Sequence, residues 1–152
     1  MNFLKRILPV LVSMALTGVM CTKKNSTEPE PEPVQGKITA VAAGIAGQNG
    51  NVYSVMVYES DWAPGSTATV VAGILAPITG DDFSLTQKLH PVDPQSPGGY
   101  SSEDKVFEPK TYSVVFFVSP QGSAPQHFAE VRVAVNGDVT ATAPIWADWV
   151  HF

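Results

Sequence analysis

The amino-acid sequence predicts an all-β fold, a single antiparallel β-sandwich of two sheets with about seven strands. From Lys37 onward, apolar residues recur with a period of two in several segments, which is the pattern of half-buried strands. These segments are rich in β-branched and aromatic residues, and turn-forming residues separate them at short intervals. No long helical periodicity appears after residue 36, so residues 37–152 are assigned to one β-sandwich domain.

Alternation identifies the individual strands of this domain. The segment 110–119 places Tyr112, Val114 and Phe116 on one face, with Val115 and Phe117 on the other. The segment 129–135 is expected to turn its valines toward the core and its charged residues toward solvent. The predicted strands are 37–47, 51–59, 67–76, 83–88, 110–119, 129–135 and 138–143.

The dipeptide Asn136-Gly137 lies between the last two predicted strands. Both residues tolerate the positive φ that a type I′ turn requires. We therefore expect a two-residue hairpin that pairs 129–135 with 138–143.

The stretch Phe107-Glu108-Pro109-Lys110-Thr111-Tyr112-Ser113-Val114 resembles the corner and strand of immunoglobulin-like and prealbumin-like domains. The resemblance implies that the Tyr112 hydroxyl hydrogen-bonds back to the corner. The final Val-x-Val-Asn-Gly-Asp-Val-Thr segment, residues 133–140, also resembles the last two strands of those folds. The domain has no Cys pair with a core Trp between, which excludes an antibody-type domain.

The first residues have the pattern of a secretory signal peptide, assigned to 1–20. Lys5 and Arg6 precede an uncharged run of 14 residues, Ile7 to Met20. A membrane-spanning helix needs about 20 apolar residues, so this run is short for a permanent anchor. It ends at Cys21, the one cysteine of the chain.

Gly18-Val19-Met20-Cys21 resembles the lipobox of bacterial lipoproteins, although Met20 replaces the small residue that usually precedes the cysteine. The resemblance implies a diacylglyceryl group on the Cys21 thiol, cleavage before it, and acylation of the new amine. Two or three acyl chains hold a protein firmly in a membrane. The residue after the cysteine is Thr22 and not Asp, which resembles the default for outer-membrane sorting of such lipoproteins, so we expect a lipid-anchored protein of the cell envelope.

Residues 21–36 are predicted to form the lipidated cysteine and a linker. Glu and Pro alternate from Glu28 to Pro33, which disfavours helix and favours an extended polyproline-II-like spacer. The segment is expected to be a stalk between the membrane and the domain.

Charge and chemistry exclude several function classes. The formal net charge is -5, with 9 Lys and Arg against 14 Asp and Glu, so a nucleic-acid partner is not expected. His90, His127 and His151 are widely spaced and match no metal-binding motif. No nucleophile motif such as Gly-x-Ser-x-Gly occurs either, so we expect neither an enzyme nor a metal or other cofactor.

Aromatic residues near the predicted strand ends are the candidate binding residues: Trp62, Tyr100, Trp146 and Trp149. Aromatic rings at such places stack on sugars or anchor protein partners. The alternative is that the tryptophans plug the ends of the sandwich. Tyr100 lies in the Pro-, Gly- and Ser-rich loop 89–105, which is the candidate recognition loop.

The sequence thus predicts an envelope lipoprotein with a non-enzymatic binding or adhesion domain that takes an envelope protein or a glycan. The alternative is an accessory subunit that docks on a larger envelope complex, and a small metal-dependent hydrolase is a remote third. A binding module requires exposed aromatics around a concave surface, whereas a docking subunit requires a flat apolar patch or an open strand edge. The hydrolase requires converging histidines and carboxylates.

Overall fold

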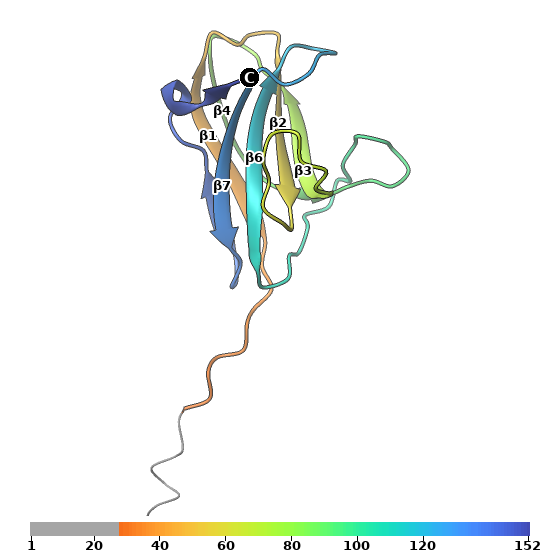
Figure 1. The fold of residues 1–152 in the computed structure, drawn as a ribbon, viewed down its shortest axis with the longest axis vertical. Helices are drawn as coiled ribbons and strands as arrows, with labels where there is room; N and C mark the ends of the chain where they lie inside the picture. Colours follow the sequence, from red (N-terminus) through yellow and green to blue (C-terminus); the bar gives the residue numbers. More distant parts are fainter. Residues whose placement is uncertain (1–27) are drawn as a thin grey trace, which may run out of the picture. The chain divides into compact units, whose positions relative to one another are not determined.

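The computed structural model describes residues 28–152, so the predicted signal peptide, Cys21 and residues 22–27 lie outside the described residues (Figure 1). Glu28–Glu32 are exposed and belong to no helix or strand. Pro33–Phe152 form one compact unit. In the described part of the chain, no helix is long and apolar enough to cross a membrane.

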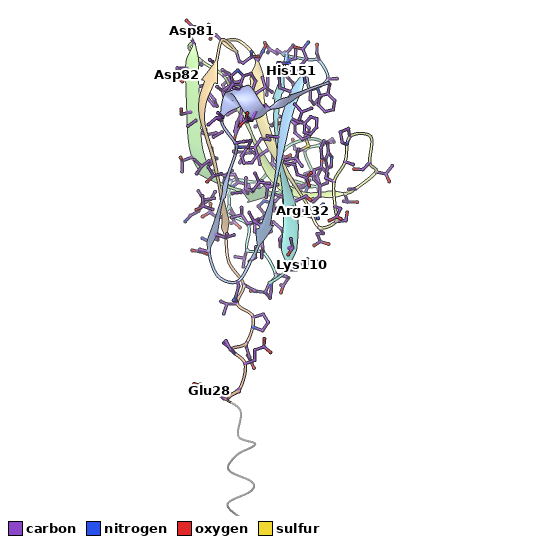
Figure 2. The ribbon with its side chains drawn as sticks, turned by 60° about the vertical axis from the view of Figure 1, so that its left-hand side comes forward. Glu28, Asp81, Asp82, Lys110, Arg132 and His151 are labelled. Atoms are coloured by element: carbon purple, nitrogen blue, oxygen red, sulfur yellow. The ribbon has the colours of Figure 1, made fainter. Side chains whose placement is uncertain are left out.

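The larger sheet has six strands in the order β5-β3-β2-β6-β7-β9, all paired antiparallel. Its strands are β2 (Val52–Tyr58), β3 (Val70–Pro77), β5 (His90–Pro91), β6 (Thr111–Ser119), β7 (His127–Ala134) and β9 (Val150–His151). A short 3₁₀ turn, η1 (Trp146–Asp148), precedes β9. Figure 2 shows Lys110 and Arg132 near the end where β6 begins, and Asp81, Asp82 and His151 at the opposite end.

The smaller sheet has three strands in the order β4-β1-β8. They are β1 (Ile38–Ala46), β4 (Asp82–Lys88) and β8 (Val139–Thr142). The predicted two-sheet, all-β fold is therefore confirmed. The seven predicted segments correspond to the seven strands longer than two residues, and β5 and β9 are short additions.

One pairing differs from the antiparallel prediction. β1 runs antiparallel to β4 but parallel to β8, with Ile38 opposite Val139 and Val41 opposite Thr142. The first long strand thus pairs with the last one, which joins the two ends of the domain sequence in one sheet.

The prediction of a hairpin at Asn136-Gly137 is wrong, because β8 pairs with β1 and not with β7. β7 belongs to the larger sheet and β8 to the smaller one, so the dipeptide connects two sheets rather than two paired strands. Gly137 has a φ of 86°, but among the described residues no non-glycine residue has a positive φ, so the turn is not type I′. The Asn136 side chain instead accepts a hydrogen bond from the Val34 amide at 3.0 Å.

Residues just before β1 close the domain at this end. The Gly137 amide donates to the Val34 carbonyl at 2.8 Å, and Gly36 and Phe107 exchange two backbone hydrogen bonds. A Cβ on Gly36 would lie 2.0 Å from the Gly137 carbonyl oxygen, so the close approach requires glycine here. Val34 and Gly36, which the sequence assigns to the linker, are therefore hydrogen-bonded to the sandwich, although the Val34 side chain is exposed.

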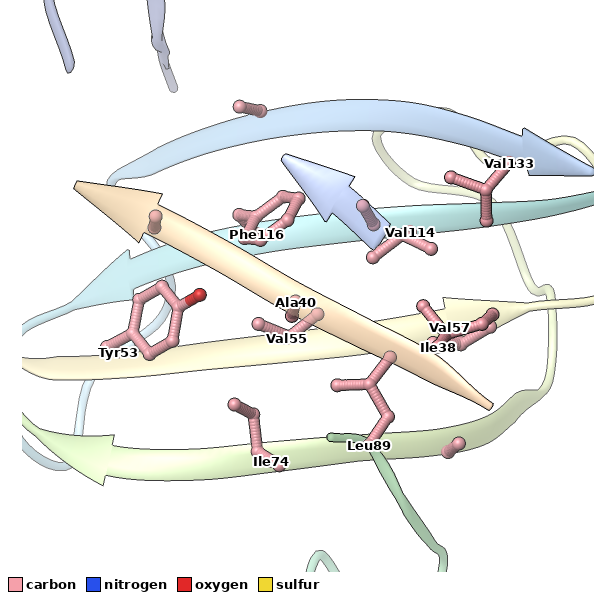
Figure 3. Close-up of a cluster of buried hydrophobic side chains, with 14 of the residues drawn as sticks. Ile38, Ala40, Tyr53, Val55, Val57, Ile74, Leu89, Val114, Phe116 and Val133 are labelled. Carbon is pink, nitrogen blue, oxygen red and sulfur yellow. The ribbon is translucent and has the colours of Figure 1, made fainter. Parts of the chain in front are cut away.

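The core between the sheets is built from alternate residues of each strand (Figure 3). Tyr53, Val55 and Val57 of β2 are fully buried, and Ile38 and Ala40 of β1 cover them. Burying each large apolar side chain contributes about 1.5–3 kcal/mol. The predicted inward face of β6 is confirmed, as is that of the valines in 129–135.

The corner before β6 has the hydrogen bond that the resemblance implied. The Tyr112 hydroxyl donates to the Glu108 carbonyl at 3.0 Å, and the ring packs edge-on against Phe107 at 5.1 Å between centroids. This bond fixes the direction in which the chain enters β6.

Candidate functional site

The four candidate aromatic residues lie in different surroundings. Trp62 and Trp149 are buried, with 9% and 4% of their surface exposed. Trp146 and Tyr100 are half-buried. The four residues therefore do not form one binding surface.

Trp62 covers the outer face of the larger sheet. The loop between β2 and β3 carries its indole over β6 and β7, where it packs edge-on against Phe117 and Phe128 at 5.6 and 5.1 Å. Tyr58 and Val115 complete this second buried cluster. The loop that carries Trp62 therefore covers the apolar outward face of β6, and Trp62 is a packing residue.

Polar contacts hold the Trp62 loop against the sheet. The Trp62 amide donates to the Ser113 hydroxyl at 3.4 Å, and that hydroxyl donates to Glu130 at 2.9 Å. Arg132 pairs with Asp61 of the loop at 2.9 Å. These contacts satisfy Ser113, one of two buried polar residues in the described chain.

Trp149 also has a packing role. Its ring lies in the main core near Phe116, and its indole nitrogen donates to the Pro144 carbonyl at 3.1 Å. Trp146 packs on it at 5.1 Å between centroids and contacts His127 at 4.9 Å. Trp149 thus packs within the sandwich, as the alternative for the tryptophans predicted, whereas Trp62 is buried on the outer face of the larger sheet and not at an end of the sandwich.

The His127 ring contacts the His151 ring across β7 and β9, at 4.2 Å between centroids. Burial lowers the pKa of His127, and the neighbouring His151 lowers it further. His90 lies on β5 at the opposite edge of the same sheet. In residues 28–152, no three His, Cys, Asp or Glu side chains form a group that could hold a metal ion.

Tyr100 lies over the outer face of β3. A Cβ on Gly73 would be 2.6 Å from the hydroxyl oxygen of Tyr100, so the missing side chain makes room for this ring. Val92 and Tyr100 form a β-bridge, and the Ser96 and Gly99 amides donate to carbonyls within the loop. The segment 92–100 is thus an ordered hairpin-like loop that positions Tyr100.

Two hollows flank the Tyr100 ring, and we call them together the Tyr100 groove. The apolar hollow, about 230 Å³, is lined by Met56, Val70, Leu75, Val92, Gly98, Gly99 and Tyr100. The polar hollow, about 290 Å³, is lined by Ile74, Leu75, Gln87, His90, Tyr100 and Ser101. Leu75 and Val92 are 52% and 38% exposed, so apolar surface remains open to solvent here.

The polar hollow contains both satisfied and unsatisfied groups. His90 Nδ1 lies 2.7 Å from the Glu103 carbonyl, and His90 Nε2 lies 3.0 Å from Gln87 Nε2. This arrangement assigns the proton to Nδ1 and makes Nε2 the acceptor. The Ser101 hydroxyl oxygen is buried and has no hydrogen-bond partner. Burial raises the pKa of Tyr100, so its hydroxyl stays protonated near neutral pH.

Tyr100 and its loop were predicted from the sequence, whereas Met56, Gly73 and Leu75 were not. A signal was present, because residues 70–77 are apolar at both alternating positions and include a glycine. That pattern indicates a strand covered on both faces, with a close contact at the glycine.

No protein-family model matches the chain, and neither a curated protein nor a solved structure gives a significant match.

Proposed function

We propose that this protein is a lipid-anchored lipoprotein of the bacterial cell envelope whose β-sandwich is a non-enzymatic binding module. The observation that carries the binding role is the Tyr100 groove, where a half-buried aromatic ring separates two hollows beside the exposed Leu75 and Val92. Aromatic anchors next to open apolar surface are typical of binding sites.

The anchoring role comes from the sequence. The basic and apolar start and the lipobox-like residues Gly18 to Cys21 favour acylation of Cys21. The Glu-Pro segment then gives the domain reach from the membrane.

The accessory-subunit alternative is favoured by a specific observation as well, because the larger sheet has an open strand edge next to the groove. Both roles use the same surface. They differ in the occupant, since an adhesion module takes an external ligand and a subunit takes a resident envelope protein.

Two measurements test this proposal. Mass spectrometry of the N-terminal peptide from membrane-extracted protein is expected to show a peptide that starts at Cys21 and carries acyl mass. An unmodified peptide that starts elsewhere would contradict the anchor.

The binding role is tested by photo-crosslinking in intact membranes. A photoreactive aromatic residue in place of Val92 should give a discrete adduct that Tyr100→Ala abolishes. The control is the same residue in place of Ile145, which is 69% exposed but remote from the groove in sequence and structure. Equal adducts from both positions, or an adduct that survives Tyr100→Ala, would refute the groove as the site.

A further inference from the structure

The edge of β3 is open beside the Tyr100 groove. β5 pairs with β3 only at Ala72 and Gly73, and no strand of the described residues pairs with that edge beyond Gly73. The sheet therefore ends in an unpaired stretch from Ile74 to Pro77.

The hydrogen-bonding groups on this edge follow from the register. The Ile78 amide donates to the Asn51 carbonyl at 2.8 Å. Alternate residues of an antiparallel strand direct their N–H groups to the same neighbour, so the Ala76 and Ile74 amides also face β2. Because antiparallel ladders alternate, the N–H and C=O of Leu75 point away from β2, toward the open edge. Pro77 has no N–H, so Leu75 carries the free donor of this stretch.

The two hollows lie on opposite sides of that edge. Met56 and Val70 of the apolar hollow belong to the outer face of the sheet. Ile74 and Gln87 of the polar hollow belong to the side that faces the smaller sheet. A strand placed along β3 would direct successive side chains to these two sides in turn.

We propose that the occupant of the groove is an extended polypeptide segment that adds to the larger sheet along β3. Its backbone pairs with Leu75, one apolar side chain enters the hollow of Met56 and Val70, and the next, polar, side chain enters the hollow of His90. The unpartnered Ser101 hydroxyl gives that polar side chain a hydrogen-bonding group. Strand addition takes affinity from main-chain hydrogen bonds and specificity from alternate side-chain pockets.

The inference rests on the proposed function and specifies its ligand. The test titrates the purified full chain in detergent with a synthetic peptide of alternating valine and serine, capped by lysines, in a calorimeter. A peptide of the same composition, with its valines and serines in separate blocks, is the control. The alternating peptide should bind at least about tenfold more tightly, because both peptides offer the same backbone but only the alternating one directs an apolar side chain to one hollow and a polar side chain to the other.

Leu75→Pro removes the edge donor and is expected to weaken binding about tenfold. Thr86→Pro is the matched control, since Thr86 lies opposite Val41 on β4, at an edge of the smaller sheet, and should leave the affinity within about twofold. If Leu75→Pro unfolds the protein, peptides with N-methylated valines test the same backbone pairing without a change to the chain, and they should fail to bind.

Absence of alternating-peptide binding, or equal binding of the N-methylated peptide, would overturn the strand addition. The proposed function has a separate test, because it is refuted if Tyr100→Ala leaves the membrane adduct unchanged. An adduct that depends on Tyr100 but tolerates Leu75→Pro would keep the groove and assign it another occupant, such as a glycan.

Discussion

The outer face of the larger sheet is closed on one side and open on the other. Over β6 and β7, Trp62 lies in a buried cluster with Tyr58, Val115 and Phe117. Over β3 and β2, Tyr100 covers Gly73 but leaves Leu75 half exposed beside two hollows. The loops of Trp62 and Tyr100 thus both cover apolar surface of the larger sheet, the first completely and the second only in part. An aromatic loop residue therefore marks a binding surface only where it leaves part of the apolar face uncovered.

The closed side predicts the largest effect. Trp62→Ala should lower the free energy of unfolding by about 3–5 kcal/mol, because it empties the space between Phe117 and Phe128. Urea unfolding followed by circular dichroism measures this loss. A change below about 1 kcal/mol would show that the loop does not seal the sheet.

The open side predicts a smaller loss of stability. Tyr100→Ala should cost about 1 kcal/mol in the same urea experiment, because the ring is only half-buried. The variant is expected to fold and to lose the membrane adduct. If instead it is destabilised as much as Trp62→Ala, Tyr100 is a packing residue and the contrast between the two sides disappears.

Acidification should weaken the end of the sheet next to the closed side. The lowered pKa of His127 means that the unfolded chain takes up a proton at a higher pH than the folded chain does. The stability that His127 contributes is therefore complete above its ordinary pKa of 6.5 and is lost as pH falls below that value. The midpoint temperature of thermal unfolding should fall more steeply between pH 7.5 and pH 5.5 for the wild type than for His127→Gln. Parallel curves of midpoint temperature against pH would contradict this.

The smallest effect concerns the ion pair that crosses from the Trp62 loop to β7. Arg132 and Asp61 are 54% and 82% exposed, so their coupling should be no more than about 0.5 kcal/mol. A double-mutant cycle with Arg132→Ala and Asp61→Ala measures it. A coupling above about 2 kcal/mol would mean that charge, rather than the indole, closes the loop.

Much of the fold was predictable, because it depends on local alternation. The alternation correctly divided the residues of β6 between two faces, and the predicted hydrogen bond of the Tyr112 hydroxyl to the corner is present. The pairing of strands was less predictable. Asn136-Gly137 favours a hairpin locally, but β7 pairs with β6 and β9 in the larger sheet, and β8 pairs with β1 in the smaller one.

The candidate site was only half predictable for a related reason. The sequence placed Trp62 and Tyr100 in loops, but it did not indicate which of the two rings would be buried against the sheet and which would stay partly exposed. That distinction depends on Gly73, on Leu75 at the edge, and on the short β5. These are properties of the assembled sheet, and no local pattern specifies them.

Amide hydrogen exchange of the purified full chain would report whether the larger sheet is open along β3 beside Tyr100. Ile74 and Ala76 direct their N–H groups to β2, whereas Leu75 directs its N–H to the open edge. The Leu75 amide is expected to exchange at least about tenfold faster than those of its two neighbours. Equal protection of all three amides would show that this edge is already paired and would refute an open β3 edge.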